Sequence, residues 1–185
     1  MVVPLPGNAV NMVQLFGKLP THGDFLARGL SPAERDALDG WMSAGLSDVR
    51  GKLGAEFEDL YDRAPPWRFV TRAGALMNAG VMIPSIDSAG RRFPFYLAGL
   101  GLAPAQALDA AAQCEALLYR AFEEAWTVDR LAGEAGSIVP QPGETVHMEA
   151  VWWTAGGEDF PPVQLSGERP SGLFQTLLSA RQEKA

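Results

Sequence analysis

Short apolar or alternating runs occur at five places along the chain, and glycine or proline bounds most of them. Runs of this length, rich in β-branched and aromatic residues, are typical of strands. The predicted strands are residues 12–16, 67–71, 76–83, 93–100 and 145–152. The stretch from 156 to 169, with several glycines and prolines, predicts a surface loop.

Apolar residues recur at helical spacing in four other segments. The predicted helices are residues 32–45, 49–60, 105–130 and 173–178. The first has a clear start, because Ser31 is a preferred N-cap, Pro32 suits the first helical position and Glu34 completes a capping box. Gly45 is expected to end it, which makes the following apolar positions a separate helix.

The composition is that of an ordinary globular protein, with 47% hydrophobic and 20% charged residues. A chain of 185 residues suffices for one domain. We expect a loose tail over residues 1–11 and a single domain over 12–185. The expected fold is α/β, with a mixed, largely antiparallel sheet of about five strands packed between helices as a three-layer αβα sandwich.

Charge and hydropathy exclude several classes of protein. The net charge is −7 and the basic residues are scattered, so nucleic acid is not an expected partner. No apolar run approaches the ~20 residues that span a bilayer, and no basic residue precedes Lys18 to suggest a secretory signal. The single cysteine, Cys114, fits a reducing compartment. We therefore expect a cytoplasmic protein that is not embedded in a membrane.

Polar residues gather in two loops, each at the end of a predicted strand. The first loop carries Lys18, Asp24 and Arg28, and the second carries Ser85, Asp87 and Arg91. If the loops are neighbours, their aspartates and arginines can pair in bidentate bridges. Such a cluster either recognises a partner or only ties the two loops together, and the residues alone favour neither interpretation.

Catalytic and metal-binding patterns are weak. The histidines, His22 and His147, and the lone cysteine are spread along the chain, so we expect no metal site and no cofactor. No G-x-S-x-G element is present. A serine hydrolase could be assembled only on paper, from Ser85 or Ser88 with His22 and an aspartate from either loop.

Four segments, in this order, resemble the signatures of the TagF family, also called ImpM, an accessory protein of bacterial type VI secretion. They are GKLPTHGDF at 17–25 followed by Arg28, APPWRF at 64–69, GVMIPSIDSAGRRFP at 80–94 and VWW at 151–153. The resemblance implies a compact α/β fold and a cytoplasmic post-translational regulator, generally a repressor of assembly or firing. It also implies a protein partner in the apparatus, above all a forkhead-associated (Fha) scaffold protein, and no enzymatic activity.

The resemblance transfers a candidate binding surface and no catalytic residue. Its polar members are Lys18, Asp24, Arg28, Ser85, Asp87 and Arg91, and its motif glycines are Gly17, Gly23 and Gly90. Two alternatives stay open. The loops form a pocket in which Lys18, Ser85 and Arg91 hold a phosphate or carboxylate, as in a ligand sensor or an enzyme. Otherwise the motifs only stabilise the fold, and another surface, such as the long helix, binds the partner.

Overall fold

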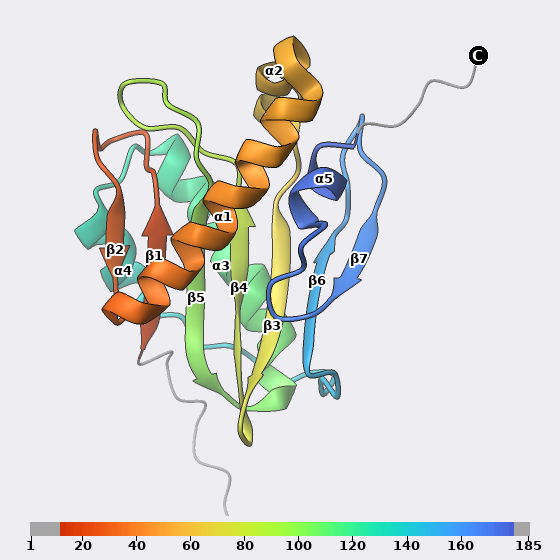
Figure 1. Cartoon of the computed structure of the whole chain (residues 1–185). Helices are drawn as coiled ribbons and strands as arrows, with labels where there is room; N and C mark the ends of the chain where they lie inside the picture. Colours follow the sequence, from red (N-terminus) through yellow and green to blue (C-terminus); the bar gives the residue numbers. More distant parts are fainter. Residues whose placement is uncertain (1–11, 180–185) are drawn as a thin grey trace, which may run out of the picture.

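A seven-stranded sheet forms the centre of the computed structural model, which describes residues 12–179 (Figure 1). Its strands are β1 (Val13–Gly17), β2 (Leu26–Arg28), β3 (Trp67–Ala73), β4 (Leu76–Ile83), β5 (Phe95–Leu102), β6 (Ala150–Thr154) and β7 (Val163–Ser166). They lie in the order β2-β1-β5-β4-β3-β6-β7, and every pairing is antiparallel. The expected tail at 1–11 lies outside the described residues.

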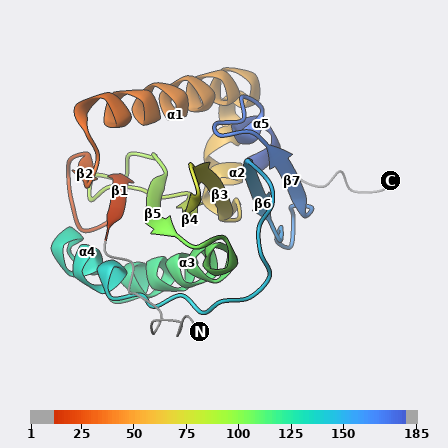
Figure 2. The same ribbon diagram turned by 90° about the horizontal axis from the view of Figure 1, so that it is seen from below.

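Helices cover both faces of the sheet (Figure 2). One face carries α1 (Pro32–Leu53), α2 (Phe57–Arg63) and α5 (Leu173–Leu177), and the other carries α3 (Ala107–Glu123) and α4 (Val128–Gly136). Each face buries its own apolar cluster, around Phe69 and Trp152 on the α1 side and around Val81 and Leu97 on the α3 side. The predicted three-layer αβα sandwich is therefore confirmed. Among residues 12–179, no helix combines the length and apolar character that crossing a membrane requires.

The sheet has more strands than the sequence pattern predicted. The strand β2 is too short to give a periodic signal, and β7 lies inside the segment predicted to be a loop. In β7, half-buried Val163 and Leu165 alternate with exposed Gln164 and Ser166. Both extra strands are at the edges of the sheet, where pairing with one neighbour is enough to define a strand.

Two predicted helix boundaries are wrong. The first helix does not end at Gly45 but continues to Leu53, and a 3₁₀ turn at Gly54–Glu56 separates it from α2. The expected helix 105–130 is divided, because α3 ends at Glu123 and α4 begins after Thr127, which caps it. The longest helix is consequently α1.

Gly45 lies within α1 at a position that faces α5. A Cβ atom at this position would lie 2.2 Å from the Phe174 ring. Gly45→Ala is therefore expected to destabilise the protein by roughly 1–3 kcal/mol, although alanine is the better helix former. Gly51→Ala, also in α1 but with nothing within 4 Å of the added Cβ, is expected to stabilise by about 0.5–1 kcal/mol. Urea denaturation of both variants checks the sign, and a stabilised Gly45→Ala would contradict the packing argument.

Candidate functional site

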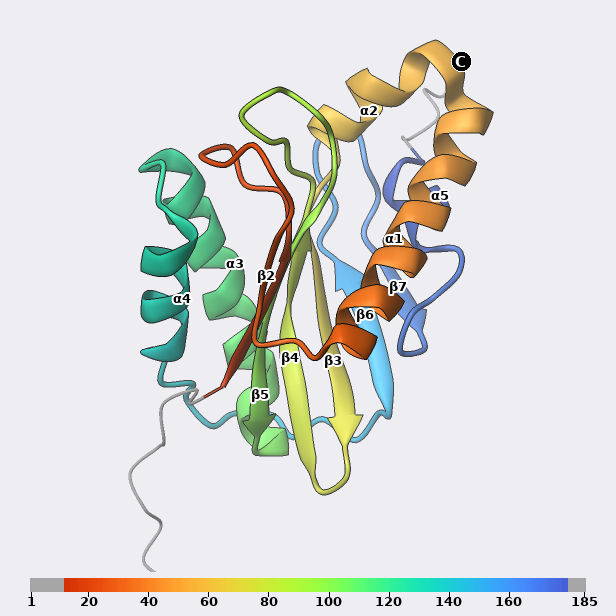
Figure 3. The same ribbon diagram turned by 60° about the vertical axis from the view of Figure 1, so that its left-hand side comes forward.

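The two motif loops meet at one end of the strands (Figures 1 and 3). One loop follows β1, and the other connects β4 to β5. Because β1 and β5 pair antiparallel, with Gly17 opposite Phe95, the end of β1 lies beside the start of β5. The strand register therefore brings together two segments that are some 70 residues apart in the chain.

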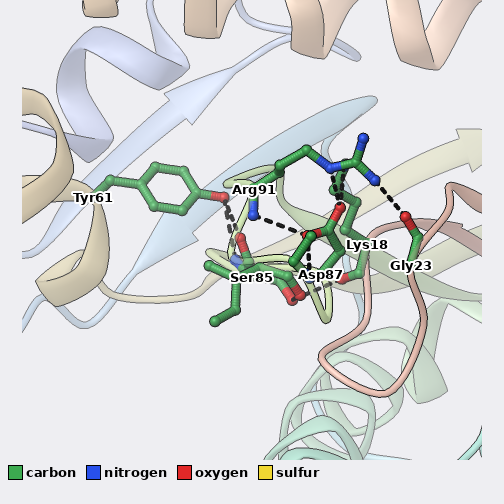
Figure 4. A network of polar contacts seen from close by, with 8 residues as sticks. Lys18, Gly23, Tyr61, Ser85, Asp87 and Arg91 are labelled. Carbon is green, nitrogen blue, oxygen red and sulfur yellow. Dashed lines mark hydrogen bonds and ion pairs between the residues drawn. The ribbon is translucent and has the colours of Figure 1, made fainter.

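A buried ion-pair network joins the loops (Figure 4). The Lys18 ammonium lies 2.5 Å from one Asp87 carboxylate oxygen, and Arg91 Nε donates to the same oxygen at 2.7 Å. The other oxygen accepts from the main-chain nitrogens of Ala89 and Arg91, at 3.0 and 2.9 Å. The Lys18 hydrogen bond, foremost among these donors, holds the pKa of Asp87 far below its usual value, against the opposing effect of burial.

Further hydrogen bonds cross between the loops. The Ser85 hydroxyl donates to the Lys18 carbonyl at 2.7 Å, and the Ser88 main-chain nitrogen donates to the His22 carbonyl at 2.9 Å. The Arg91 guanidinium also donates to the Gly23 carbonyl. These contacts make the two loops one rigid unit.

Helix α2 supports this unit from the side. The Tyr61 hydroxyl accepts from the Ser85 main-chain nitrogen at 3.1 Å and donates to its carbonyl at 3.2 Å. Arg92 donates to both oxygens of Asp62 at 2.8 Å, and it lies 3.1 Å from a Glu58 oxygen. This bridge lowers the pKa of Asp62. No sequence pattern pointed to Tyr61 or Asp62, because their partners are more than 20 residues away.

Burial divides the six predicted polar site residues. Lys18, Ser85 and Asp87 are buried, whereas Asp24, Arg28 and Arg91 are exposed. Arg91 pairs with Asp87, but through Nε alone and not in the expected bidentate bridge, because its Nη2 donates to the Gly23 carbonyl. Arg28 lies at the edge strand β2, 3.5 Å from Asp129 of α4, so its expected pairing with Asp24 does not form. The structure therefore brings five of the six residues to one loop unit and places Arg28 beside α4.

The exposed part of the unit combines charge with apolar side chains. We call it the loop surface, and its members are Asp24, Phe25, Ile86, Ser88, Ala89, Gly90 and Arg91. Phe25 and Ile86 are 51% and 39% exposed. The Phe25 ring packs edge-on against Phe93, with 4.7 Å between ring centroids, and the Lys18 ammonium lies 4.8 Å from its centre. The loop surface is therefore held in place from beneath and remains accessible from outside.

The chemistry available in the unit is limited by these contacts. The Ser85 hydroxyl donates to the main chain, and the His22 ring pairs with the neighbouring Thr21 hydroxyl at 2.8 Å. The described residues contain no group of three or more histidine, cysteine or carboxylate side chains able to hold a metal ion. The arrangement is suited to presenting a fixed surface to a partner.

Comparisons with known proteins agree with the fold. Residues 14–137 match the family model described as the TagF N-terminal domain, type VI secretion system-associated. The chain is also similar to the crystal structure of PA0076 from Pseudomonas aeruginosa PAO1, with 26% identity and a TM-score of 0.72. That match covers 94% of this chain and 96% of the other. No curated protein matches the sequence.

Proposed function

This chain belongs to the TagF family, whose N-terminal domain is associated with type VI secretion, and on this premise we propose that it is a cytoplasmic negative regulator of the apparatus. It acts after translation by binding a protein component, and it prevents assembly or firing. The partner that the family resemblance favours is a forkhead-associated scaffold protein. The loop surface is the proposed contact.

One observation carries this proposal: a partly apolar surface is held rigid by a buried network. Phe25 and Ile86, one on each of the joined loops, expose apolar area, and the same two loops carry the exposed charges of Asp24 and Arg91. Apolar side chains that are fixed before binding lose little entropy in the complex, so they suit an interface. Lys18 and Asp87, beneath them, are the groups that fix the loops.

We also propose that the protein is not an enzyme. Of the side chains in the two loops that could take part in a reaction, Lys18, Ser85 and Asp87 are buried and hydrogen-bonded within the protein. The half-buried His22 ring pairs with the Thr21 hydroxyl. A nucleophile or a general base must reach the reacting atom of its substrate. The same occupied contacts argue against a phosphate or carboxylate between Lys18 and Ser85.

Ala89→Arg should abolish regulation without affecting the fold. The Ala89 side chain is exposed on the loop surface, and only its main-chain nitrogen takes part in the network. A long charged side chain there keeps a partner from closing on the surface. We expect at least about a 30-fold loss of affinity for the scaffold protein, as at an interface hot spot, and a loss of repression in a secretion reporter.

Ala75→Arg is the matched control. Ala75 is exposed in the turn between β3 and β4, at the opposite end of the strands from the loop surface, and the substitution makes the same chemical change (Figure 1). It should leave binding and repression at the wild-type level. If Ala89→Arg also binds and represses normally, the loop surface is not the contact. If both variants fold but neither binds, the effect follows from charge alone.

A further inference from the structure

A cavity of about 110 Å³ lies between the first half of α1 and the sheet. It is lined by residues of β1, β5, β4, β3 and β6, together with Glu168 and Arg169 between β7 and α5. None of its lining residues belongs to the loop surface. A ligand bound here would therefore not touch the loop surface.

The sheet is unexpectedly polar beneath this part of α1. Residues two apart on a strand share a face, so Gln14 lies on the same face as Phe16, and Thr71 on the same face as Phe69. Both phenylalanines belong to the apolar cluster under α1. Asn78 is directly opposite Thr71 in the β3–β4 pairing and also lines the cavity. Polar groups at core-facing positions cost free energy unless they find hydrogen-bond partners.

The protein supplies only part of those partners. The Gln14 side chain, 8% exposed, donates to Glu34 at 3.2 Å, and the Asn78 oxygen accepts from the Gly101 main-chain nitrogen at 3.3 Å. Within residues 12–179, the hydroxyls of Tyr96 and Thr71 and the Asn78 amide nitrogen make no hydrogen bond to the protein, and none of them is among the buried atoms left without a partner, so they are open to water or a ligand in the cavity. Burial raises the pKa of Tyr96, so its hydroxyl stays protonated and can donate.

Charges of both signs surround the same volume. Arg169 and Glu168 are exposed at the cavity, and in the described part of the chain Arg169 has no carboxylate within 4.0 Å. Glu34 contributes a second carboxylate from the first turn of α1, where it accepts from the Ser31 main-chain nitrogen at 2.7 Å. The Ser31 hydrogen bonds, with smaller contributions from Gln14 and Arg169, lower the pKa of Glu34, so it is ionised at neutral pH.

We infer that this cavity binds a small zwitterion of the α-amino-acid class. The ligand carboxylate faces Arg169 and the hydroxyl of Tyr96, and the ligand ammonium faces the two carboxylates. A ligand with only a negative charge would be repelled by the carboxylates of Glu34 and Glu168. A ligand with only a positive charge would be repelled by the Arg169 guanidinium. The volume is below the roughly 150 Å³ that holds benzene, which favours the smallest members, glycine and alanine.

Proton–nitrogen correlation spectra of the full chain test this inference. The indole N–H groups of Trp41 and Trp152 report on the cavity that their side chains line, and Trp126, at the junction of α3 and α4, is the internal control. At constant ionic strength, glycine or alanine should shift the first two signals saturably, with a dissociation constant in the millimolar range. Acetate and ethylammonium, which carry one charge each, should produce no saturable shift.

Two variants separate binding from a merely structural role. Arg169→Gln should weaken glycine binding at least about tenfold, and Tyr96→Phe, which keeps the ring, about threefold to tenfold. Arg35→Gln removes an exposed arginine of α1 that pairs with Asp36 outside the cavity, and it should bind as the wild type does. The inference would be overturned if about 50 mM glycine and alanine produced no saturable shift. It would also be overturned if acetate or ethylammonium shifted the signals equally, or if Arg169→Gln bound glycine as the wild type does.

Discussion

Asp87→Ala is expected to lower the melting temperature by about 10 °C. The Asp87 side chain is fully buried and accepts from Lys18, from Arg91 and from two main-chain nitrogens. Its removal leaves the Lys18 ammonium, 6% exposed, without a counter-charge and releases the loop between β4 and β5. A buried charge that loses its partner is among the most destabilising changes known in proteins. Thermal unfolding followed by circular dichroism measures the effect.

Two substitutions define the cause. Lys18→Met should cost less than Asp87→Ala, because Asp87 keeps Arg91 and both main-chain donors. Asp24→Ala, which is exposed, should unfold within about 2 °C of the wild type. A larger loss in Lys18→Met than in Asp87→Ala would show that the lysine, not the carboxylate, organises the loops.

The pH dependence of stability gives an independent check of the same pair. The pKa of Asp87 is lower in the folded protein than its ordinary value of 3.8. The stabilisation is therefore fully present above that value and is lost as pH falls below about 4. The difference in melting temperature between the wild type and Asp87→Asn should be constant from about pH 5 to 8 and narrow in more acidic solution. Narrowing above pH 5 would contradict a lowered pKa.

Gly17→Ala is expected to cost more than about 3 kcal/mol, or to prevent folding. Gly17 has φ = 124°, which L-residues with a side chain rarely adopt. A Cβ atom there would also lie 2.0 Å from the Pro94 carbonyl oxygen and 3.0 Å from Cα of Phe95. Both are main-chain atoms of the segment paired with β1, so relief requires the two strands to separate. Chemical denaturation of purified protein, or recovery in the soluble fraction, measures the loss.

The other motif glycines serve as controls for this argument. Gly90 also has a positive φ, of 77°, but an added Cβ meets nothing within 4 Å, so Gly90→Ala should cost about 1–2 kcal/mol from strain alone. Gly23→Ala brings Cβ to 3.4 Å from the Ser88 hydroxyl, an ordinary contact, and should change stability by less than about 0.5 kcal/mol. If all three substitutions lowered the free energy of unfolding equally, the close approach of Gly17 to the main chain at β5 would not be the cause of the Gly17→Ala loss.

These expectations affect how regulation is tested. A variant of Lys18 or Asp87 that fails to repress secretion has lost part of its fold, so its phenotype says little about the contact. Ala89→Arg, at an exposed side chain, changes the surface while leaving the Asp87 network in place. Whether the loop surface is the contact is therefore decided by comparing the binding and repression of Ala89→Arg with those of Ala75→Arg.

Local sequence patterns predicted the elements whose causes are local. The capping box at Ser31 and Glu34 is present, with both of its hydrogen bonds. The long strands β3, β4 and β5 lie close to their predicted positions, because a strand covered on both faces of the sheet appears in the sequence as a short apolar run. The sequence therefore determined the fold class, the start of α1 and the pair of polar loops.

Long-range contacts decided the rest. Gly45 lies inside α1 and does not end it, and a glycine is needed there because the Phe174 ring, far along the chain, occupies the space of a side chain. The sequence placed Lys18 and Asp87 in two polar loops and in a candidate binding surface, but only the β1–β5 register places them 2.5 Å apart and out of solvent. The break between α3 and α4 lies beside another motif contact, from the Thr21 hydroxyl to the Trp126 carbonyl at 2.8 Å. In each case the deciding partner is distant in sequence, so only the tertiary structure separates the buried polar groups Lys18, Ser85 and Asp87, which hold the loops together, from the exposed ones.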